Sequence, residues 1–412
     1  MIITKNKMKK SNNKIIENMK TVVCEYVGFG HPDMVADQVS DALLDEFLKQ
    51  DPDTRAGIEV MVKDNIVVLG GEVKSQGRID YDSTVRRVFE NLPYPANHHL
   101  SADEIKVINL IGKQSPEISR GVDQANGIIG AGDQGWVAAM ATNETEDYLP
   151  LGAHFTKKIC QYIAARTDLG FGPDCKSQVV VNYDDKGHAQ IDSILVSTMQ
   201  QGELKTDRKT IETIIRSNKM GIDKIAFMKH IYLTENIPQI IVNPNGEWRI
   251  GGSVSDCGVT GRKIVVNQFG GYCSVGGGSL CSKDMSKVDR SAAYMCRYLA
   301  KNIVAARIAG TAKVELSYMI GVPHPSSINV ELSDSKYCVN DVIEWIKTNI
   351  DLSPNGIIQR FDGGYPRYYN TALNGHYGKT DKEMQDERTA LLYPWEKTDL
   401  AKSLFHFLNT KK

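Results

Sequence analysis

One order of predicted elements, strand, helix, strand, strand, helix, strand, returns three times along the chain, and this repetition constrains the fold most. In the first unit a strand at 21–27 precedes a helix at 33–50, whose apolar residues at positions 35, 39, 43 and 47 share one face. A hairpin at 58–73, a helix at 81–90 and a strand at 105–110 complete this unit.

The second and third units follow the same order. The second has a strand at 135–141, a helix at 151–166, a hairpin at 178–198, a helix after Asp207 and a strand at 239–243. The third has a strand at 263–268, a helix at 289–309, a hairpin at 313–331, a helix at 339–349 and a short strand at 357–358. We therefore expect an α+β fold of three mixed sheets, each covered by helices, about a pseudo-threefold axis. No residue-level identity links the units, so chance alternation of strands and helices is the alternative.

These units predict a domain organisation. We expect a flexible N-terminal extension at 1–20, a first unit at 21–125 with a mobile loop at 114–124, a second unit at 126–250, and a third unit with a C-terminal tail at 251–412. We also expect the domains to be discontinuous in the chain. The extension is rich in lysine and asparagine and lacks the continuous apolar core of a signal peptide.

Composition excludes several classes of protein. The 412 residues include 41% apolar and 24% charged residues and carry a formal net charge of -1, which argues against nucleic acid as the main partner. No apolar run approaches the roughly 20 residues that a membrane helix needs. The eight cysteines are scattered without CxxC pairs, which favours free thiols in a reducing cytoplasm over a disulfide framework.

The stretch from Gly251 to Tyr294 concentrates the chemistry. It holds paired glycines together with four basic and three acidic side chains: Arg262, Lys263, Lys283, Lys287, Asp256, Asp284 and Asp289. Glycine lets backbone approach a ligand closely and the basic residues supply charge, so this composition suits a polyphosphate. The alternative is a solvated hairpin whose glycines only make turns. The stretch is not a Walker A loop, because a serine precedes Lys283 and an aspartate follows it.

Three shorter loops carry further candidates. At 28–33, Pro32 and Asp33 suit a helix start, where the carboxylate either caps backbone N–H groups or holds a metal, and His31 either donates to a phosphoryl oxygen or satisfies a local carbonyl. The polar segment 114–124 is either a mobile lid or an inert surface loop. The loop at 130–135 either brings backbone near a ligand beside Asp133 or is a tight turn in which Asp133 bonds to its own backbone.

In this order the motifs resemble the S-adenosylmethionine synthetase family, also called methionine adenosyltransferases. The resemblance rests on GHPDMVADQVSDALLDEFLKQDP, GKQSP, GAGDQG, ATNETEDYLPL, GVTGRKIVV, GGGSLCSKDMSKVDRSAAY, SYMIGVPHPSSINVE, GHYGK and PWEKTD. It covers nearly everything from about residue 21 to 400 without a large insertion.

This resemblance implies a fold and a reaction. The fold is three β-α-β-β-α-β units with discontinuous domains, in a homodimer with active sites at the subunit interface, often paired into a homotetramer. The substrates are ATP and L-methionine: the methionine sulfur displaces triphosphate from C5′ of the ribose, and the triphosphate is hydrolysed to pyrophosphate and phosphate. Two Mg²⁺ ions per site and K⁺ are the implied cofactors. A thioether has no proton to lose, so the burden falls on alignment and on the charge of the leaving group.

The resemblance also implies roles for single residues. Those implied for catalysis are His31, Lys176, Arg262, Lys283 and Lys287. Those implied for ATP binding are His31, Asp174, Lys176, Glu247, Trp248, Asp256, Arg262, Lys263, Ser279 and Lys283, with Trp248 as the aromatic beside adenine. Those implied for methionine binding are Glu72, Gln114, Asp133, Asp256 and Lys287. Asp33 and Asp289 are implied as Mg²⁺ ligands, and Glu59 as a K⁺ ligand.

Five positions depart from the family pattern. Met34 replaces a lysine, Phe29 an acid, Glu247 an arginine, Val275 a histidine and Ser282 a glycine. Their sum predicts a less cationic pocket with weaker triphosphate retention or slower hydrolysis of the triphosphate, so Met34→Lys should raise tripolyphosphate hydrolysis. The alternatives to an active synthetase are a weakly active or non-catalytic homologue that serves as a regulatory subunit, and an adenosyl transferase or triphosphatase with another acceptor.

Overall fold

The computed structural model of the chain describes residues 20–114, 130–201, 208–222, 224–227 and 238–411. The expected N-terminal extension, apart from Lys20, lies outside these residues. The expected lid also lies outside them, apart from Gln114.

The first sheet has the strand order β1-β7-β8-β9. Strands β7 (Phe171–Tyr183) and β8 (Ala189–Gln200) form the expected hairpin, and β1 (Lys20–Val27) pairs antiparallel with β7. Strand β9 (Gln239–Val242) pairs parallel with β8. Helix α4 (Leu151–Ala164) packs on β7 and β1, and α5 (Arg208–Arg216) packs on β9, while α6 (Lys224–Phe227) is a helix of four residues. The first strand of the chain thus lies in the sheet of the expected second unit.

The second sheet has the order β10-β2-β3-β4, with β5 also paired to β3. Its hairpin is β2 (Arg55–Lys63) and β3 (Ile66–Lys74), and its turn residue Asp64 adopts φ 52°. Strands β4 (Lys106–Asn109) and β5 (Gly112–Lys113) run parallel to β3, whereas β10 (Gly258–Val259) is antiparallel to β2. Helix α1 (Pro32–Leu48) packs on β2 and on α2 (Tyr81–Glu90).

The third sheet has the order β12-β11-β6 and is antiparallel throughout. It consists of β6 (Gly135–Thr142), β11 (Thr311–Tyr318) and β12 (Ser327–Ser333), with α8 (Val288–Ala305) on β6 and β11 and α9 (Val339–Asn349) on β12. The expected strand at 357–358 is wrong, because these residues lie in α10 (Pro354–Phe361). Ser353 caps that helix by accepting from the Gly356 N–H, and a proline stands at its first position.

The expected strand at 263–268 is also wrong. Ile264–Asn267 form the short helix α7, although a run of β-branched residues favours a strand. The remaining helices are α11 (Tyr368–Asn374) against α1, α12 (Glu387–Leu392), and α13 (Ala401–Thr410) against α8 and α9.

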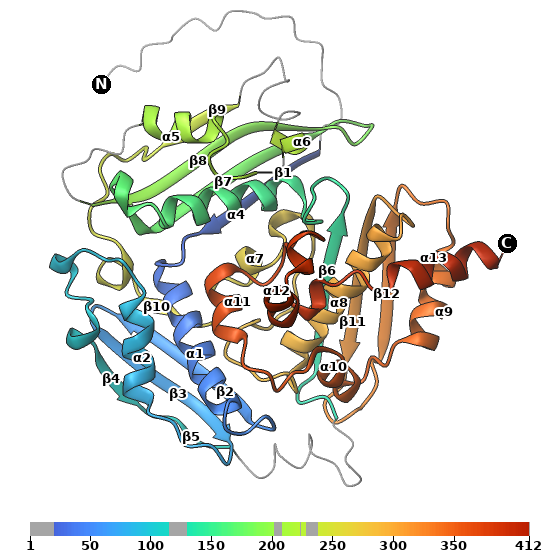
Figure 1. The fold of residues 1–412 in the computed structure, drawn as a ribbon, viewed down its shortest axis with the longest axis horizontal. Coiled ribbons are helices and arrows are strands. Elements are labelled where there is room, and N and C mark those ends of the chain that lie inside the picture. The colour runs from blue at the N-terminus through green and yellow to red at the C-terminus, as the bar shows by residue number, and fades with distance from the viewer. Residues whose placement is uncertain (1–19, 115–129, 202–207, 223, 228–237, 412) are drawn as a thin grey trace, which may run out of the picture.

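The three sheets surround a central group of helices, with α1, α4 and α8 on their inner sides (Figure 1). One hydrophobic core joins the second and third sheets, and a second core lies between α4 and the first sheet. The predicted fold class, an α+β fold of several sheets covered by helices, is confirmed. The residue boundaries of the three units remain a prediction.

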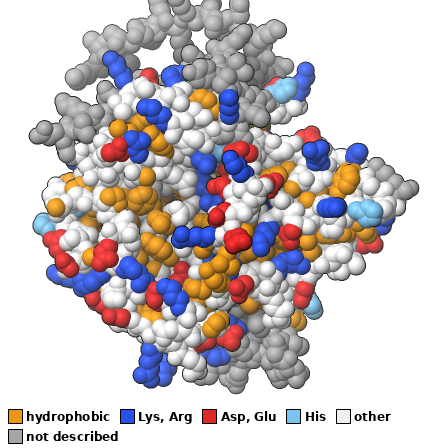
Figure 2. Space-filling view, in the orientation of Figure 1, with side chains coloured by type: hydrophobic (Ala, Val, Ile, Leu, Met, Phe, Trp, Pro, Cys, Tyr) orange, Lys and Arg blue, Asp and Glu red, His pale blue; other side chains and the backbone are white. Residues whose placement is uncertain are grey.

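The surface carries no single dominant charge on the face shown in Figure 2, where acidic and basic side chains are mixed and apolar patches lie between them. This mixture agrees with the net charge of -1. An anionic ligand is therefore attracted by local clusters of side chains rather than by the field of the whole molecule.

Candidate active site

A cleft of about 440 Å³ opens where α1 begins, beside β7. Six of the predicted site residues line it: His31, Asp174, Lys176, Glu247, Trp248 and Asp256. They come from four separate segments of the chain, so the fold brings distant motifs to one place.

His31 caps the start of α1. Its Nδ1 accepts a hydrogen bond from the Asp33 N–H at 3.2 Å, so the ring proton lies on Nε2. Burial, together with the positive charges of Lys263 and Lys176, lowers the pKa of His31 to about 3. The side chain is therefore neutral near pH 7 and presents one N–H donor. The structure thus shows a local role for Nδ1 and leaves Nε2 for a ligand.

Asp33 is a buried carboxylate that holds the basic pair. Its Oδ2 forms an ion pair with Lys263 Nζ, and its Oδ1 accepts from the Val259 N–H at 2.9 Å. Arg262 lies 3.6 Å from Oδ1 and is about half exposed. Asp33 therefore accepts from a backbone N–H, as one of its two predicted roles requires, but that N–H belongs to another segment and not to α1. Its other oxygen neutralises a lysine.

Asp174 is buried at the base of the cleft. Its Oδ2 accepts from the Gly252 N–H at 2.8 Å, whereas Oδ1 has no hydrogen-bond partner within the part of the chain that the structure describes. Burial raises the pKa of this carboxyl to about 7. A buried polar atom without a partner is costly, so Oδ1 is a strong candidate acceptor for a ligand hydroxyl.

Trp248 and Glu247 form another wall of the cleft. The indole Nε1 donates to the Ile250 carbonyl at 2.6 Å, which fixes the ring plane. Glu247 is exposed and pairs with Arg249 at 3.1 Å. The carboxylate at this departure from the family pattern is therefore partly neutralised by a neighbouring arginine.

The remaining basic residues lie at a second place, at the start of α8. Lys283 Nζ is 2.5 Å from Asp289 Oδ2, and Lys287 Nζ is 2.6 Å from Asp284 Oδ2. Asp284 is buried and also accepts from the Ala56 N–H at 2.8 Å. A Cβ at Gly278 would overlap the Asp289 carboxylate, so only glycine allows this approach of the loop.

Strand β2 sets the spacing between the two places. Val259 pairs with Met61, and Lys283 forms an isolated antiparallel bridge with Gly57. Four residues of strand separate these positions, which corresponds to about 13 Å. Of Lys176, Arg262 and Lys283, only Lys176 lines the cleft of about 440 Å³.

Glu59 connects the two places. One carboxylate oxygen accepts from Thr260 Oγ1, and the other lies 3.4 Å from Ser282 Oγ. Ser279 also lies close to Gly261, since a Cβ there would be 3.0 Å from Ser279 Cβ. The glycine-rich loop and the Arg262–Lys263 loop thus touch.

The predicted methionine-side residues are less well assembled. Glu72 is half-buried on β3 opposite Gly57. Gln114 has a buried Oε1 without a hydrogen-bond partner among the described residues. Asp133 is exposed and accepts from the Gln134 N–H at 2.8 Å, which matches the tight-turn alternative for its loop.

Two departures from the family pattern have clear structural settings. Met34 is 1% exposed and packs in the core between α4 and the first sheet, which favours a packing role, and its interpretation as a charge missing beside the polyphosphate stays a prediction. Ser282 is fully buried and adopts φ 73°, a left-handed conformation that suits the glycine it replaces.

Two residues outside the motifs support the cleft. Tyr94 OH donates to the Gly30 carbonyl, and His98 Nε2 accepts from the Gly251 N–H at 3.3 Å. Both lie in a loop after α2 with no motif of its own, so only spatial contact reveals them.

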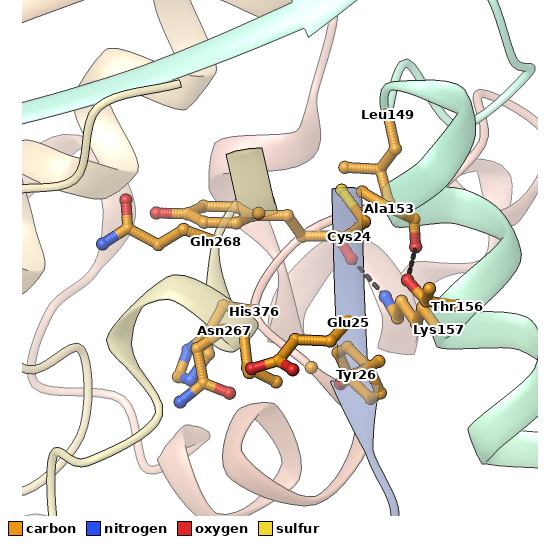
Figure 3. Close-up of a pocket in the computed structure, with 14 residues that line it drawn as sticks. Cys24, Glu25, Tyr26, Leu149, Ala153, Thr156, Lys157, Asn267, Gln268 and His376 are labelled. Atoms are coloured by element: carbon orange, nitrogen blue, oxygen red, sulfur yellow. Dashed lines mark hydrogen bonds between the residues drawn. The ribbon is translucent and has the colours of Figure 1, made fainter. Parts of the chain in front are cut away.

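Figure 3 shows a smaller cavity of about 20 Å³ beside β1 and α4, which has room for roughly one water molecule. Lys157 lines it and donates to the Tyr377 carbonyl, and burial lowers the pKa of this lysine to about 7. None of the predicted site residues lines it, and it is too small for a substrate.

Models of three domains of one family match the chain in order. The N-terminal domain of S-adenosylmethionine synthetase matches residues 19–116, the central domain 128–248 and the C-terminal domain 250–388. The chain belongs to the S-adenosylmethionine synthetase family. This membership confirms the predicted resemblance and the prediction of an enzyme that makes S-adenosylmethionine.

Individual members of the S-adenosylmethionine synthetase family align over most of the chain. An S-adenosylmethionine synthase from Mycoplasmopsis pulmonis is 37% identical and covers 91% of this chain and 95% of its own length. One from Trichodesmium erythraeum is 37% identical and covers 91% and 94%. A solved structure of an unusual S-adenosylmethionine synthetase from Campylobacter jejuni has a TM-score of 0.81 and 33% identity over 94% of this chain and 99% of that one.

The family is generally metal-dependent, and the oxygen donors of this synthetase chain suit hard cations. Among the described residues no group of three or more His, Cys, Asp or Glu side chains is placed to hold a metal. Mg²⁺ is commonly bound by one or two carboxylates together with substrate phosphates, which Asp33 and Asp289 fit. Glu59, with two hydroxyls beside it, offers oxygen ligands for a larger cation. In the described part of the chain no helix is long and apolar enough to cross a membrane.

Proposed function

We propose that this chain joins ATP and L-methionine by attack of the methionine sulfur on C5′ of the ribose. The new S–C5′ bond forms as the C5′–O bond breaks, and the electron pair of that bond leaves with the triphosphate. The triphosphate is then hydrolysed to pyrophosphate and phosphate. The cleft that gathers His31, Asp174, Lys176 and Trp248 beside the Arg262–Lys263 pair carries this proposal.

In this proposal the cleft holds the nucleoside. Trp248 stacks on adenine. The hydrogen bond to the Ile250 carbonyl holds its ring in place for this contact. The free Oδ1 of Asp174 accepts from a ribose hydroxyl. Asp256 and Glu247 line the same wall and contact the nucleoside.

The basic residues hold the leaving group. Lys176, Arg262, Lys263 and the neutral Nε2–H of His31 face the α-phosphate end, where negative charge develops on the departing oxygen. Lys283 and Lys287, beside the glycine-rich loop with Ser279, hold the distal phosphates. Since sulfur loses no proton, a neutral histidine that only donates suits the step.

Mg²⁺ and K⁺ are the proposed cofactors. Two Mg²⁺ ions, held by Asp33 and Asp289 together with the phosphates, would neutralise charge on the triphosphate, and Glu59 would hold K⁺. Glu72, Gln114, Asp133 and Lys287 are proposed to bind methionine.

The division of the basic residues between two places supports a homodimer with active sites at the subunit interface. A single chain puts them about 13 Å apart along β2. The outer side of the second sheet exposes Met61 and Ile108, 41% and 47% exposed, which a second copy can cover. A homotetramer is the larger assembly proposed. The eight cysteines are all free, which supports a reducing cytoplasm.

The interface proposal has a direct test by mixing variants. Homodimers of Lys176→Met and homodimers of Lys283→Met should each be inactive. Suppose that each site takes Lys176 from one subunit and Lys283 from the other. Refolding an equal mixture should then restore about a quarter of the wild-type rate, because half of the dimers carry one intact site. No recovery would place both lysines in the site of one chain.

The reaction itself is tested with purified protein, ATP, methionine, Mg²⁺ and K⁺. S-adenosylmethionine with phosphate and pyrophosphate, measured by chromatography, supports the proposal. Binding without turnover would indicate a regulatory subunit, and phosphate without the sulfonium product would indicate another acceptor. Lys176→Met should abolish turnover, whereas Lys186→Met, an exposed lysine at the far turn of the same hairpin, should not.

A further inference from the structure

Four carboxylates lie on one face of α1. Asp33, Asp37, Asp41 and Asp45 are spaced by four residues, which places them one above another on a helix of 3.6 residues per turn. All four are buried, at 1%, 0%, 0% and 7% exposed. A buried row of carboxylates is unfavourable unless each has a partner.

The four carboxylates accept backbone N–H groups from three segments of the C-terminal part of the chain. Asp33 accepts from Val259, Asp37 from Gly261 at 2.9 Å, and Asp41 from Ser282 at 3.0 Å. Asp45 accepts from Tyr368 and Tyr369, both at 2.9 Å. The carboxylates of helix α1 therefore fix the backbone of these segments by hydrogen bonds.

Asp37 and Asp45 differ from the other two because their hydrogen-bond donors among the described residues are all neutral. Asp33 pairs with Lys263, and Asp41 pairs with Arg290 through two bonds of 2.7 Å. Within the described residues, Asp37 accepts from the Gly261 N–H and from the Asn267 Nδ2 at 3.3 Å. Burial raises the pKa of both Asp37 and Asp45 to about 7, so the ionised form of each carboxyl is destabilised in the folded protein.

Asp37 holds the residue next to the basic pair. Gly261 has φ 74° and directly precedes Arg262 and Lys263, while Asn267 ends α7, which follows them. The Asp37 carboxylate is thus hydrogen-bonded to both ends of the segment that carries Arg262 and Lys263. Asp45 grips the start of α11, which carries no predicted site residue.

We propose that Asp37 is a positioning residue for the reaction: it fixes the backbone on both sides of Arg262 and Lys263 and so aims their side chains at the triphosphate. It touches neither substrate itself. This inference rests on the proposed role of the basic pair.

Asp45 gives the matched control, because it has the same helix, burial and type of contact. Asp37→Ala should lower kcat at least about tenfold and weaken tripolyphosphate binding, with the KM for methionine little changed, because a misplaced cation loses stabilisation of the leaving group. Asp45→Ala should keep kcat within about twofold of wild type at a similar loss of melting temperature. Asp37→Asn keeps an acceptor for Gly261 and should recover part of the loss.

The result that overturns the inference is an equal effect of Asp37→Ala and Asp45→Ala on kcat, or a methionine KM that rises as much as tripolyphosphate binding weakens. If Asp37→Ala does not fold, the Asp37→Asn and Asp45→Asn pair decides in its place, with about threefold lower kcat expected only for the first. Wild-type protein that forms no S-adenosylmethionine would instead refute the proposed function, so the two failures are distinguishable.

Discussion

Replacing Met34 by lysine distinguishes two interpretations of this position: a cation missing beside the triphosphate, and a side chain of the hydrophobic core. The sequence pattern reads Met34 as a missing cation, whereas the structure buries it among Val22, Phe155 and Cys175 in the core under α4. Lysine there must either become neutral or force the core open.

The cost can be worked from the pKa shift of a buried lysine. Such groups titrate near 6 rather than 10.4, so at pH 7 the unfolded chain holds a proton that the folded chain releases. The loss of unfolding free energy from this proton is about 4.6 kcal/mol at pH 7 and about 1.9 kcal/mol at pH 9. Because the folded pKa is depressed, the loss is greatest at low pH and shrinks as pH rises towards 10.4.

Urea denaturation of Met34→Lys and wild type at pH 7 and pH 9 measures both values. Met34→Leu is the control for packing and should cost less than about 1.5 kcal/mol at either pH. A Met34→Lys protein as stable as wild type, with no dependence on pH, would mean that the ammonium reaches water. Faster tripolyphosphate hydrolysis by that protein would then restore the interpretation from the sequence.

Three further substitutions test the site. Trp248→Ala should weaken ATP binding by about 1–3 kcal/mol while Trp248→Phe retains most of it, measured by calorimetry; equal affinity of both would exclude stacking. Ser282→Gly should be up to about 1 kcal/mol more stable than Ser282→Ala, because glycine relieves the left-handed backbone, and matching melting temperatures would argue against strain. Asp174 has a pKa of about 7, so its carboxylate charges as pH rises from 6 to 8. ATP affinity should increase over that range in wild type and not in Asp174→Asn, whereas the stability that Asp174 contributes is lost as pH rises through 7.

Much of the fold follows from local sequence. Helix α2 spans the predicted residues, and the hairpins β2–β3 and β7–β8 appear where alternation and turn residues place them. The two wrong elements are short: at 357–358 a Ser-Pro pair starts a helix, and at 263–268 contacts with α1 override the β propensity of the segment.

The pairing of strands does not follow from local sequence. Strand β1 joins β7, β6 joins β11, and β10 joins β2, each across more than one hundred residues. Alternation of apolar residues shows that a segment is a strand but carries no signal for its partner.

The sequence by itself determined the family, the α+β class with several sheets covered by helices, and the cationic, glycine-rich character of the ligand site, because these depend on residue types and their spacing. Only the tertiary structure decided that Met34 is core, that the basic residues form two places, and that the carboxylates of α1 hold the loops between them. These facts depend on which distant segments contact each other. The burial of a side chain and its hydrogen-bond partners are set by those contacts and not by the local sequence.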